Sequence, residues 1–535
     1  MTGYSPFVPK HLLIAPQDLR TADPSFAEEY YHGRYTLAGT LVETNGDSPF
    51  TLPNTDSQWS RELQSFGWLR HLAASGDPLS GSHARAIVKE WIDLDLKSSK
   101  SIEWDIETAA QRLIAWLQHS ILILSIPDHG FHQDFMRSLG THARFLKRYA
   151  VNANEGTQKL KAYLALAYAS ICFSGHASSL KFARDRLDQE LEAQIPADGC
   201  HVSRNPQAIV DILAYLLPYR QAFLKDDLEP SPAVAQTTER LLLALRFFRL
   251  GDGNLARFNG SGVTESDLVA TLLRYDESYE PDSINTSSGG YERLETGDTV
   301  LLVDAGLPPK GELSTKAHAG SLSFEVSSGS DCVIVNAGAP INSRSGSPAL
   351  WRSTAAHSTA VFYETSSCKF ESTGQSGNLL EGQLFSASLK LESERKTDAE
   401  HETVTAFHHG YVREFGARHE RAIRLHKASG SIEGTDWFSG PDKGDLYYTT
   451  KDTVTIHFHL HPDTDVAYDN NSDAIFLRTR SGKTWKFRSE KVKPRIEESI
   501  YFAGLSGPRK TNQITLRFHA CKIPEIRWIF TPASL

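Results

Sequence analysis

The sequence predicts an α+β protein of two domains, an α-helical toroid at residues 1–285 followed by an antiparallel β-sandwich at residues 286–535. Three observations support this fold class. The length of 535 residues exceeds what a single hydrophobic core usually serves. Apolar residues recur at helical spacing up to about residue 280, and after the polar segment 281–290 they alternate with a period of two.

Helices are expected in the first domain wherever one face of the segment is apolar. The breaks between them contain Gly, Pro or Asp, as at 127–130 and 196–199. Paired helices at this regular spacing suit a toroid, although periodicity alone does not distinguish a toroid from a bundle or a solenoid. The expected helices span residues 59–72, 109–122, 131–149, 156–174, 176–193, 206–224 and 232–250.

Short alternating segments, separated by Gly, Asp and Ser, predict the strands of the sandwich. No βαβ alternation, phosphate-binding loop or dinucleotide fingerprint occurs, which disfavours nucleotide chemistry. The clearest expected strands are 299–304, 331–336, 454–461 and 513–519.

Composition narrows the class of protein further. The chain is 40% hydrophobic and 23% charged, as in ordinary globular proteins. A net charge of −9 gives no long-range attraction to polyanions, so nucleic acid is not expected as a partner. The 5 cysteines are scattered, odd in number and without CxxC spacing, so neither a disulfide framework nor a zinc knuckle is implied.

Residues that could carry chemistry gather within about forty positions at the start of the second domain. Two histidines, an asparagine, a lysine and an arginine stand there among alternating apolar residues. Neighbouring strands of one sheet would present such groups to a common face, which suggests a site. The five residues are Lys316, His318, Asn336, Arg352 and His357.

This stretch resembles the start of the C-terminal β-domain of the heparinase II/III family of polysaccharide lyases. The family pattern reads roughly His-x-His-Ala-Asp, then an Ile-Val-Asp-Pro-Gly-like strand end, then Arg-Ser-Thr-x-x-His-Asn-Thr. Lys316 stands at the first His, His318 at the second, Asn336 at the Asp, Arg352 at the Arg and His357 at the last His. The resemblance extends over nearly the whole chain and implies an incomplete (α/α) toroid followed by a β-sandwich.

The resemblance also implies β-elimination on an acidic, uronic-acid-containing polysaccharide or oligosaccharide in a cleft between the two domains. Such a lyase must neutralise the C5 carboxylate, remove the C5 proton and protonate the leaving oxygen. Relatives usually supply an Asn-His pair on one toroid helix and a Tyr after an Asp-Gly turn. Aligned by eye, these positions hold Thr157-Gln158 and Ala208-Ile209, so both usual catalysts are missing.

The turn after residue 198 offers other polar groups at the start of a helix, where the helix dipole favours an anionic ligand. His201 is the candidate base, Arg204 the candidate carboxylate clamp and Asn205 a candidate substrate-binding residue. In the alternative, Ser203 or Asn205 caps the helix and His201 is an ordinary surface residue.

Three further residues complete the candidate substrate site. Lys316 could act as a base if desolvated, or bind a substrate carboxylate as a cation. Arg352 is a second candidate clamp, although a lone Lys or Arg on a strand is usually only solvated. Tyr31, in the aromatic segment 30–35, could stack on a sugar, with core packing as the alternative.

In relatives the positions of His318, Asn336 and His357 form a metal site, typically for zinc. Imidazole suits zinc or another divalent cation, but the neutral amide of Asn336 replaces a carboxylate and should weaken binding. The alternative is a hydrogen-bonded polar cluster that ties strands together without metal.

The amino terminus lacks a charged n-region and an apolar h-region, and no run of eighteen apolar residues occurs. We therefore expect no membrane span and a cytoplasmic location, with the periplasm, where relatives often work, as the alternative.

Two competing functions stay open. One is a glycan-binding or regulatory protein that kept the cleft and lost catalysis. The other is a glycoside hydrolase on the same toroid, which would need two facing carboxylic acids, with Glu107, Asp198 and Glu325 as candidates. The sequence leaves the glycan and the oligomeric state open, a homodimer included.

Overall fold

The structure is a computed structural model. It describes residues 8–53, 56–94, 101–175, 180–224, 229–276, 285–341, 346–370, 383–385, 390–446 and 451–533. Contacts divide the chain into two compact units. The first comprises Met1–Ile195, Val210–Leu242 and Asp267–Glu277, and the second comprises Pro196–Ile209, Leu243–Ser266 and Ser278–Leu535.

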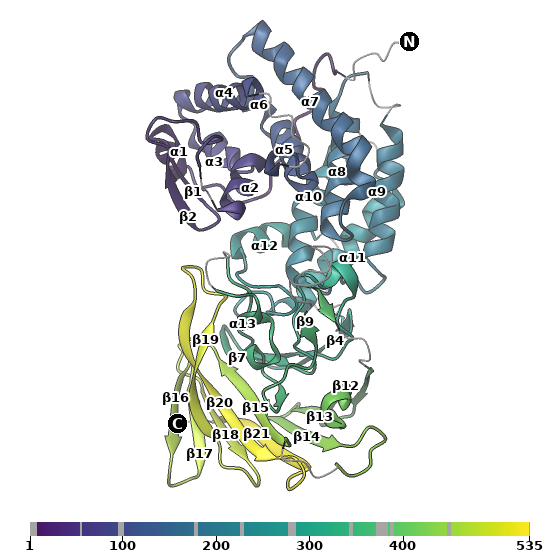
Figure 1. The fold of residues 1–535 in the computed structure, drawn as a ribbon, viewed down its shortest axis with the longest axis vertical. Helices are drawn as coiled ribbons and strands as arrows, with labels where there is room; N and C mark the ends of the chain where they lie inside the picture. Colours follow the sequence, from purple (N-terminus) through teal and green to yellow (C-terminus); the bar gives the residue numbers. More distant parts are fainter. Residues whose placement is uncertain are drawn as a thin grey trace. The chain divides into compact units, whose positions relative to one another are not determined.

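The first unit is helical, with a β-hairpin near its start (Figure 1). Several of its helices begin at an aspartate whose side chain accepts from free backbone N–H groups, as Asp105 does for the helix at 106–118. The elements in chain order are α1 (Ser25–Tyr31), β1 (Arg34–Leu37), β2 (Thr40–Glu43), α2 (Ser57–Ser65), α3 (Leu69–Ser75), α4 (Pro78–Asp93), α5 (Ile106–Gln118), α6 (Ser120–Ile123), α7 (His129–Tyr149), α8 (Thr157–Cys172), α9 (Lys181–Gln194), α10 (Pro206–Leu224), α11 (Pro232–Phe248) and α12 (Ser266–Leu273).

Most expected helices are found, but two of them are broken. The segment 59–72 forms α2 and α3, because Phe66 adopts a left-handed conformation with φ of 59° that ends α2. The segment 109–122 is interrupted at His119, where φ is −101° and ψ is 17°. Apolar periodicity continues across both breaks, so the sequence pattern does not reveal them.

The second unit contains two large antiparallel sheets (Figure 1). The eight-stranded sheet has the order β11-β12-β13-β14-β21-β18-β17-β16. The nine-stranded sheet has the order β19-β20-β15-β7-β6-β5-β4-β3, and β8 pairs with β15. The four expected strands correspond to β5, β7, β15 and β20 and are confirmed.

The strands of the nine-stranded sheet are β3 (Ser287–Ser288), β4 (Tyr291–Thr296), β5 (Thr299–Asp304), β6 (Phe324–Ser328), β7 (Asp331–Val335), β8 (Ala360–Phe362), β15 (Thr453–Leu460), β19 (Arg495–Tyr501) and β20 (Arg509–His519). The other sheet contains β11 (Leu391–Thr397), β12 (His401–Tyr411), β13 (Ala417–His426), β14 (Ile432–Ser439), β16 (Asp465–Asp469), β17 (Ala474–Arg478), β18 (Thr484–Ser489) and β21 (Glu525–Ala533). Short elements between them include β9 (Lys369–Phe370), β10 (Leu384–Phe385) and α13 (Ala349–Arg352).

One hydrophobic core lies between these sheets, because alternate side chains of both point into it. Phe324 and Phe458 of the nine-stranded sheet pack against Trp528 of the other, with ring centroids 5.5 Å and 4.9 Å apart. Such a shared core is the defining feature of a β-sandwich.

Two segments that we predicted within the toroid domain, 196–209 and 243–266, belong to the second unit. The physical reason is hydrogen bonding to the sheet: Arg204 donates to Asp304 and Arg257 donates to Glu325. Tertiary contacts across 60 to 100 residues are not encoded in local periodicity. The predicted boundary at residue 285 therefore describes the change of pattern along the chain and not the limits of each compact unit.

Candidate functional site

The polar residues between 316 and 357 lie in loops and short helices, and not on the faces of neighbouring strands as expected. Lys316 and His318 precede β6, Arg352 ends α13, and His357 follows a 3-10 turn. Asn336 directly follows β7. The alternation of apolar residues at 316–324 reflects burial of a folded loop, because Ala317, Ala319 and Leu322 are all buried.

His318 and His357 form a closed chain of hydrogen bonds in the interior of the second unit. The backbone N–H of Gly260 donates to His318 Nε2 at 3.1 Å, so the proton of this neutral ring lies on Nδ1. His318 Nδ1 then donates to His357 Nε2 at 3.0 Å, and His357 Nδ1 donates to the Ser353 carbonyl at 2.7 Å. Every ring nitrogen of the pair therefore has a partner within the protein.

Burial keeps both imidazoles neutral. The side chains are 3% and 1% exposed, for His318 and His357 respectively. Burial, with His357 and Arg352 nearby, lowers the pKa of His318 well below its ordinary value, and burial lowers the pKa of His357 to about 4. Gly320 allows this packing, since a Cβ there would lie 2.8 Å from His357 Cδ2.

Asn336, the third expected metal ligand, has its oxygen engaged in a hydrogen bond, and its remaining group is an N–H donor that cannot bind a cation. Its Oδ1 accepts from the Ser358 backbone N–H at 2.9 Å, which fixes the orientation of the amide. Its Nδ2 is a buried donor with no hydrogen-bond partner among the described residues. Since the lone pairs of His318 and His357 are also taken, this arrangement does not fit zinc or another divalent cation, which needs free lone pairs.

We expect the thermal unfolding midpoint to be insensitive to metal. The hydrogen-bond chain replaces coordination, so removing divalent ions takes away no interaction that holds the fold. Differential scanning calorimetry with EDTA and with added ZnCl2 checks this, with shifts below about 1 °C expected. A fall of many degrees with EDTA, reversed by zinc alone, would show that the three residues do bind metal.

The turn that carries Arg204 is tied to the sheet by the arginine itself. The guanidinium donates to the Gly289, Gly306 and Leu307 carbonyls and to Asp304 Oδ1, the last at 2.6 Å. It also lies over the Tyr291 ring, with Cζ 4.2 Å from the centroid. Arg204 is 7% exposed and already paired with the carboxylate of Asp304. It therefore stabilises the turn and is not placed to bind a substrate carboxylate.

His201 and Asn205 are likewise engaged locally. Ser203 donates to His201 Nδ1 from its hydroxyl at 2.7 Å and from its backbone N–H at 3.1 Å. Burial lowers the pKa of His201 to about 4, and the residue is 1% exposed. The alternative that His201 is an ordinary surface residue is therefore wrong. Asn205 Oδ1 accepts from the Gln207 backbone N–H, which caps α10 as that reading expected.

The turn that carries Arg204 and the loop that carries His318 are linked through the segment 259–260. Tyr291 donates from its hydroxyl to the Arg204 carbonyl and accepts from Asn259 Nδ2. Asn259 Oδ1 accepts from the His318 backbone N–H at 3.1 Å. Sequence reasoning missed Asn259, because it lies 59 residues from its partner and in no family pattern.

Lys316 is the one predicted catalytic residue that the structure leaves exposed. A Cβ built on Gly260 would lie 3.0 Å from Lys316 Cβ and 3.1 Å from Asn205 Nδ2, so the lysine lies beside the turn. Arg352 is 6% exposed and donates to the Ala317 and Ser314 carbonyls at 2.8 Å and 3.0 Å. Arg352 thus holds the loop that displays Lys316.

Tyr31 belongs to the first unit, at the end of α1, where its ring meets His83 edge-on at 5.2 Å. Its neighbours Tyr30 and Tyr35 are each 1% exposed and stacked 5.1 Å apart, which matches the core-packing alternative for that segment. The acids proposed for a hydrolase are also engaged: Glu325 is fully buried against Arg257, and Asp198 accepts from Gly289 and Cys200.

Residues 280–529 match the family described as "Heparinase II/III-like, C-terminal". This part of the chain is therefore similar to the heparinase II/III-like family. The structure of heparinase III has a TM-score of 0.71 at 15% identity, covering 92% of this chain and 80% of that one. Heparan sulfate lyase HepC from Pedobacter heparinus has a TM-score of 0.63 at 16% identity, covering 97% and 84%.

These similarities confirm the predicted fold class, a helical toroid followed by an antiparallel β-sandwich. A curated relative, "FtsZ-localized protein C" of Caulobacter vibrioides (strain NA1000 / CB15N), is 28% identical over 98% of this chain and 91% of its own length. None of the helices in the described ranges has the length and apolar character that crossing a bilayer requires.

Proposed function

We propose that this heparinase-like chain acts by binding, in association with FtsZ, and that β-elimination is not its function. The observation that carries this proposal is the closed hydrogen-bond chain of His318 and His357. General base catalysis needs a lone pair within reach of the substrate proton. The free lone pairs of the buried histidines His318 and His357 accept hydrogen bonds from protein donors, and burial lowers the pKa of each ring.

The remaining candidates do not restore the missing chemistry. Lys316 is exposed, whereas a lysine becomes a base when it is desolvated. Arg204 and Arg352 use their donors on carbonyl groups and on Asp304. The two toroid windows in which relatives carry their Asn-His pair and tyrosine hold other residues in this sequence.

The association with FtsZ rests on the curated relative, whose name states that localisation and whose similarity extends from end to end. A match over 98% of this chain supports a shared role for the whole molecule more strongly than a match to one domain would. The cytoplasmic location and the homodimer stay predictions.

A second candidate function is that of a polysaccharide lyase cleaving an acidic, uronic-acid-containing glycan. The fold shared with heparin lyases and the exposed Lys316 beside Asn205 favour it. In that case Lys316 would bind the substrate carboxylate or take the proton.

The two functions are separated by two measurements on the full chain. We expect no gain of ultraviolet absorbance from unsaturated uronate with heparan sulfate, alginate or polygalacturonate, and we expect biolayer interferometry to show binding to purified FtsZ but not to an unrelated acidic protein. Product formation that Lys316→Ala abolishes would establish the lyase. Failure to bind FtsZ would refute the association.

A further inference from the structure

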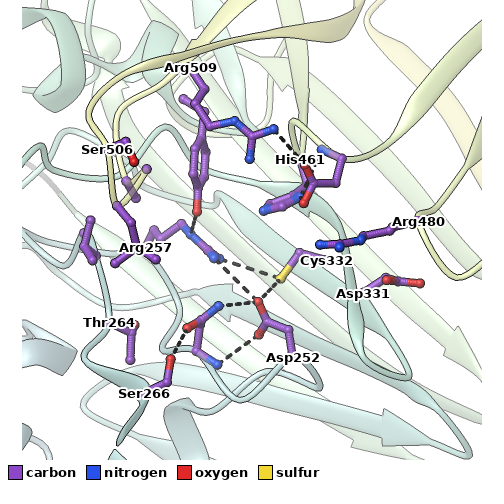
Figure 2. A pocket seen from close by; sticks show the side chains of 18 of the residues that line it. Asp252, Arg257, Thr264, Ser266, Asp331, Cys332, His461, Arg480, Ser506 and Arg509 are labelled. Atoms are coloured by element: carbon purple, nitrogen blue, oxygen red, sulfur yellow. Dashed lines mark hydrogen bonds and ion pairs between the residues drawn. The ribbon is translucent and has the colours of Figure 1, made fainter. Parts of the chain in front are cut away.

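A cavity of about 700 Å³ lies within the second unit, and none of the predicted site residues lines it (Figure 2). Its walls come from the segment 252–266, the start of β7, the segment that follows β15, the loop between β17 and β18, and the loop between β19 and β20. The volume falls in the range typical of small-molecule sites. All these segments belong to the same compact unit.

The floor of the cavity is a fixed polar network around Arg257, which is 2% exposed. Arg257 donates from Nε to the Tyr501 hydroxyl at 2.6 Å and from Nη1 to Glu325 at 3.2 Å. Beside it, the Cys332 thiol donates to Asp252 at 3.1 Å (Figure 2). A buried arginine held by several partners gives a floor that does not need to reorganise when a ligand binds.

Three donors at the cavity have hydrogen atoms for which the described residues provide no acceptor. The Tyr501 hydroxyl accepts from Arg257, and among the described residues its own hydrogen has no acceptor. His461 Nδ1 accepts from the Asp463 backbone at 3.3 Å, so the neutral ring carries its proton on Nε2. Arg480 makes no hydrogen bond or ion pair within the described part of the chain, and its guanidinium reaches toward Cys332 (Figure 2).

The charges of the described lining balance, since Arg257, Arg480 and Arg509 face Asp252, Asp331 and Asp463. Arg509 and Asp463 are paired at 2.7 Å. The site therefore favours neither an anion nor a cation. Unused donors next to carboxylates match hydroxyl groups, which accept and donate from the same oxygen.

Two rings give the cavity an apolar edge as well. Tyr501 and His461 meet edge-on with centroids 5.3 Å apart, and both line the cavity. Aromatic ring faces suit the C–H faces of a sugar ring, while the polar groups around them suit its hydroxyls.

We propose that this cavity is a binding site for a short neutral oligosaccharide. Tyr501, His461 and Arg480 donate to its oxygens, and the aspartates accept from its hydroxyls. The proposal goes beyond the function proposed above, because it requires neither FtsZ nor the residues around His318.

Isothermal titration calorimetry of the full chain with maltotriose, cellotriose and chitotriose tests this site. At least one is expected to bind with a Kd between about 1 µM and 1 mM. Arg480→Ala is expected to weaken that binding about tenfold, because it removes a charged donor. The matched control is Arg478→Ala, an exposed arginine of β17 outside the cavity, which should leave the Kd unchanged.

Tyr501→Phe provides a second variant that keeps the ring and removes the free hydroxyl hydrogen. It should also weaken binding, and because it removes the acceptor of Arg257 Nε, the thermal midpoint is measured alongside to show that the variant is folded at the temperature of the titration. The absence of binding by all three sugars, or equal affinity of the wild type and Arg480→Ala, would overturn the proposal. Tighter binding of digalacturonate than of every neutral sugar would overturn the neutral ligand class.

Discussion

The substitution Asp436→Ala is expected to lower the free energy of unfolding by about 3–5 kcal/mol, since it leaves a buried arginine without its counter-charge. Asp436 is fully buried in β14 and accepts from three neighbours. His419 Nε2 and Arg421 Nε donate to Oδ1 at 2.7 Å each, and Trp528 Nε1 donates to Oδ2 at 2.8 Å.

The network reaches from this carboxylate to the segments around the candidate site. The Gly410 backbone donates to His408 Nδ1, so His408 Nε2 donates to His419 at 3.2 Å and His419 in turn donates to Asp436. Arg421 also donates to the Leu322 and Ser358 carbonyls. Despite burial, Arg421 and His419 hold the pKa of Asp436 below its ordinary value.

Urea unfolding followed by tryptophan fluorescence measures this effect. Asp442→Ala, an exposed aspartate after β14, is the matched control and should change the free energy of unfolding by less than about 0.5 kcal/mol. Asp436→Asn should fall between the two, because the amide keeps one acceptor oxygen and faces a donor with its NH2 group. A loss below about 1 kcal/mol for Asp436→Ala would contradict the assigned role.

The second large effect is a loss of stability in mild acid, to which His357 makes a contribution of its own. Burial lowers the pKa of this ring from 6.5 to about 4. Between these two pKa values the ring is protonated in the unfolded chain but not in the folded chain, so the free energy of unfolding falls as the pH falls. The full contribution is present above pH 6.5, and about 3 kcal/mol is lost by pH 4.

His357→Asn isolates this contribution, because the amide of asparagine can still donate to the Ser353 carbonyl. We expect the variant to have a lower free energy of unfolding at pH 7. Between pH 7 and 4.5 its free energy of unfolding should also depend less on pH, because unfolding takes up fewer protons, by up to about one. His129→Asn, at an exposed position, should leave the pH dependence unchanged. An identical slope in His357→Asn and the wild type would show that this ring does not cause the acid sensitivity.

How far the sequence predicts the fold depends on how local each feature is. The strands β5, β7, β15 and β20 follow from short apolar or alternating segments between turn residues. β5 is buried along its whole length, whereas buried and half-buried residues alternate in most of β15. The break after α2 is not visible in the apolar pattern, since a single residue, Phe66, turns left-handed. Order and spacing predict the residues of the candidate site, but the structure places them in loops and short helices and not on strand faces.

The sequence by itself determined the two-part architecture and the set of polar residues, because periodicity and spacing are properties of the chain. Only the tertiary structure decided what those residues do. The backbone N–H of Gly260, 58 residues from His318, fixes which nitrogen of that ring carries the proton. With that contact, every ring nitrogen of His318 and His357 has a partner within the protein. A lone pair that accepts from one donor is not available to a metal or a substrate.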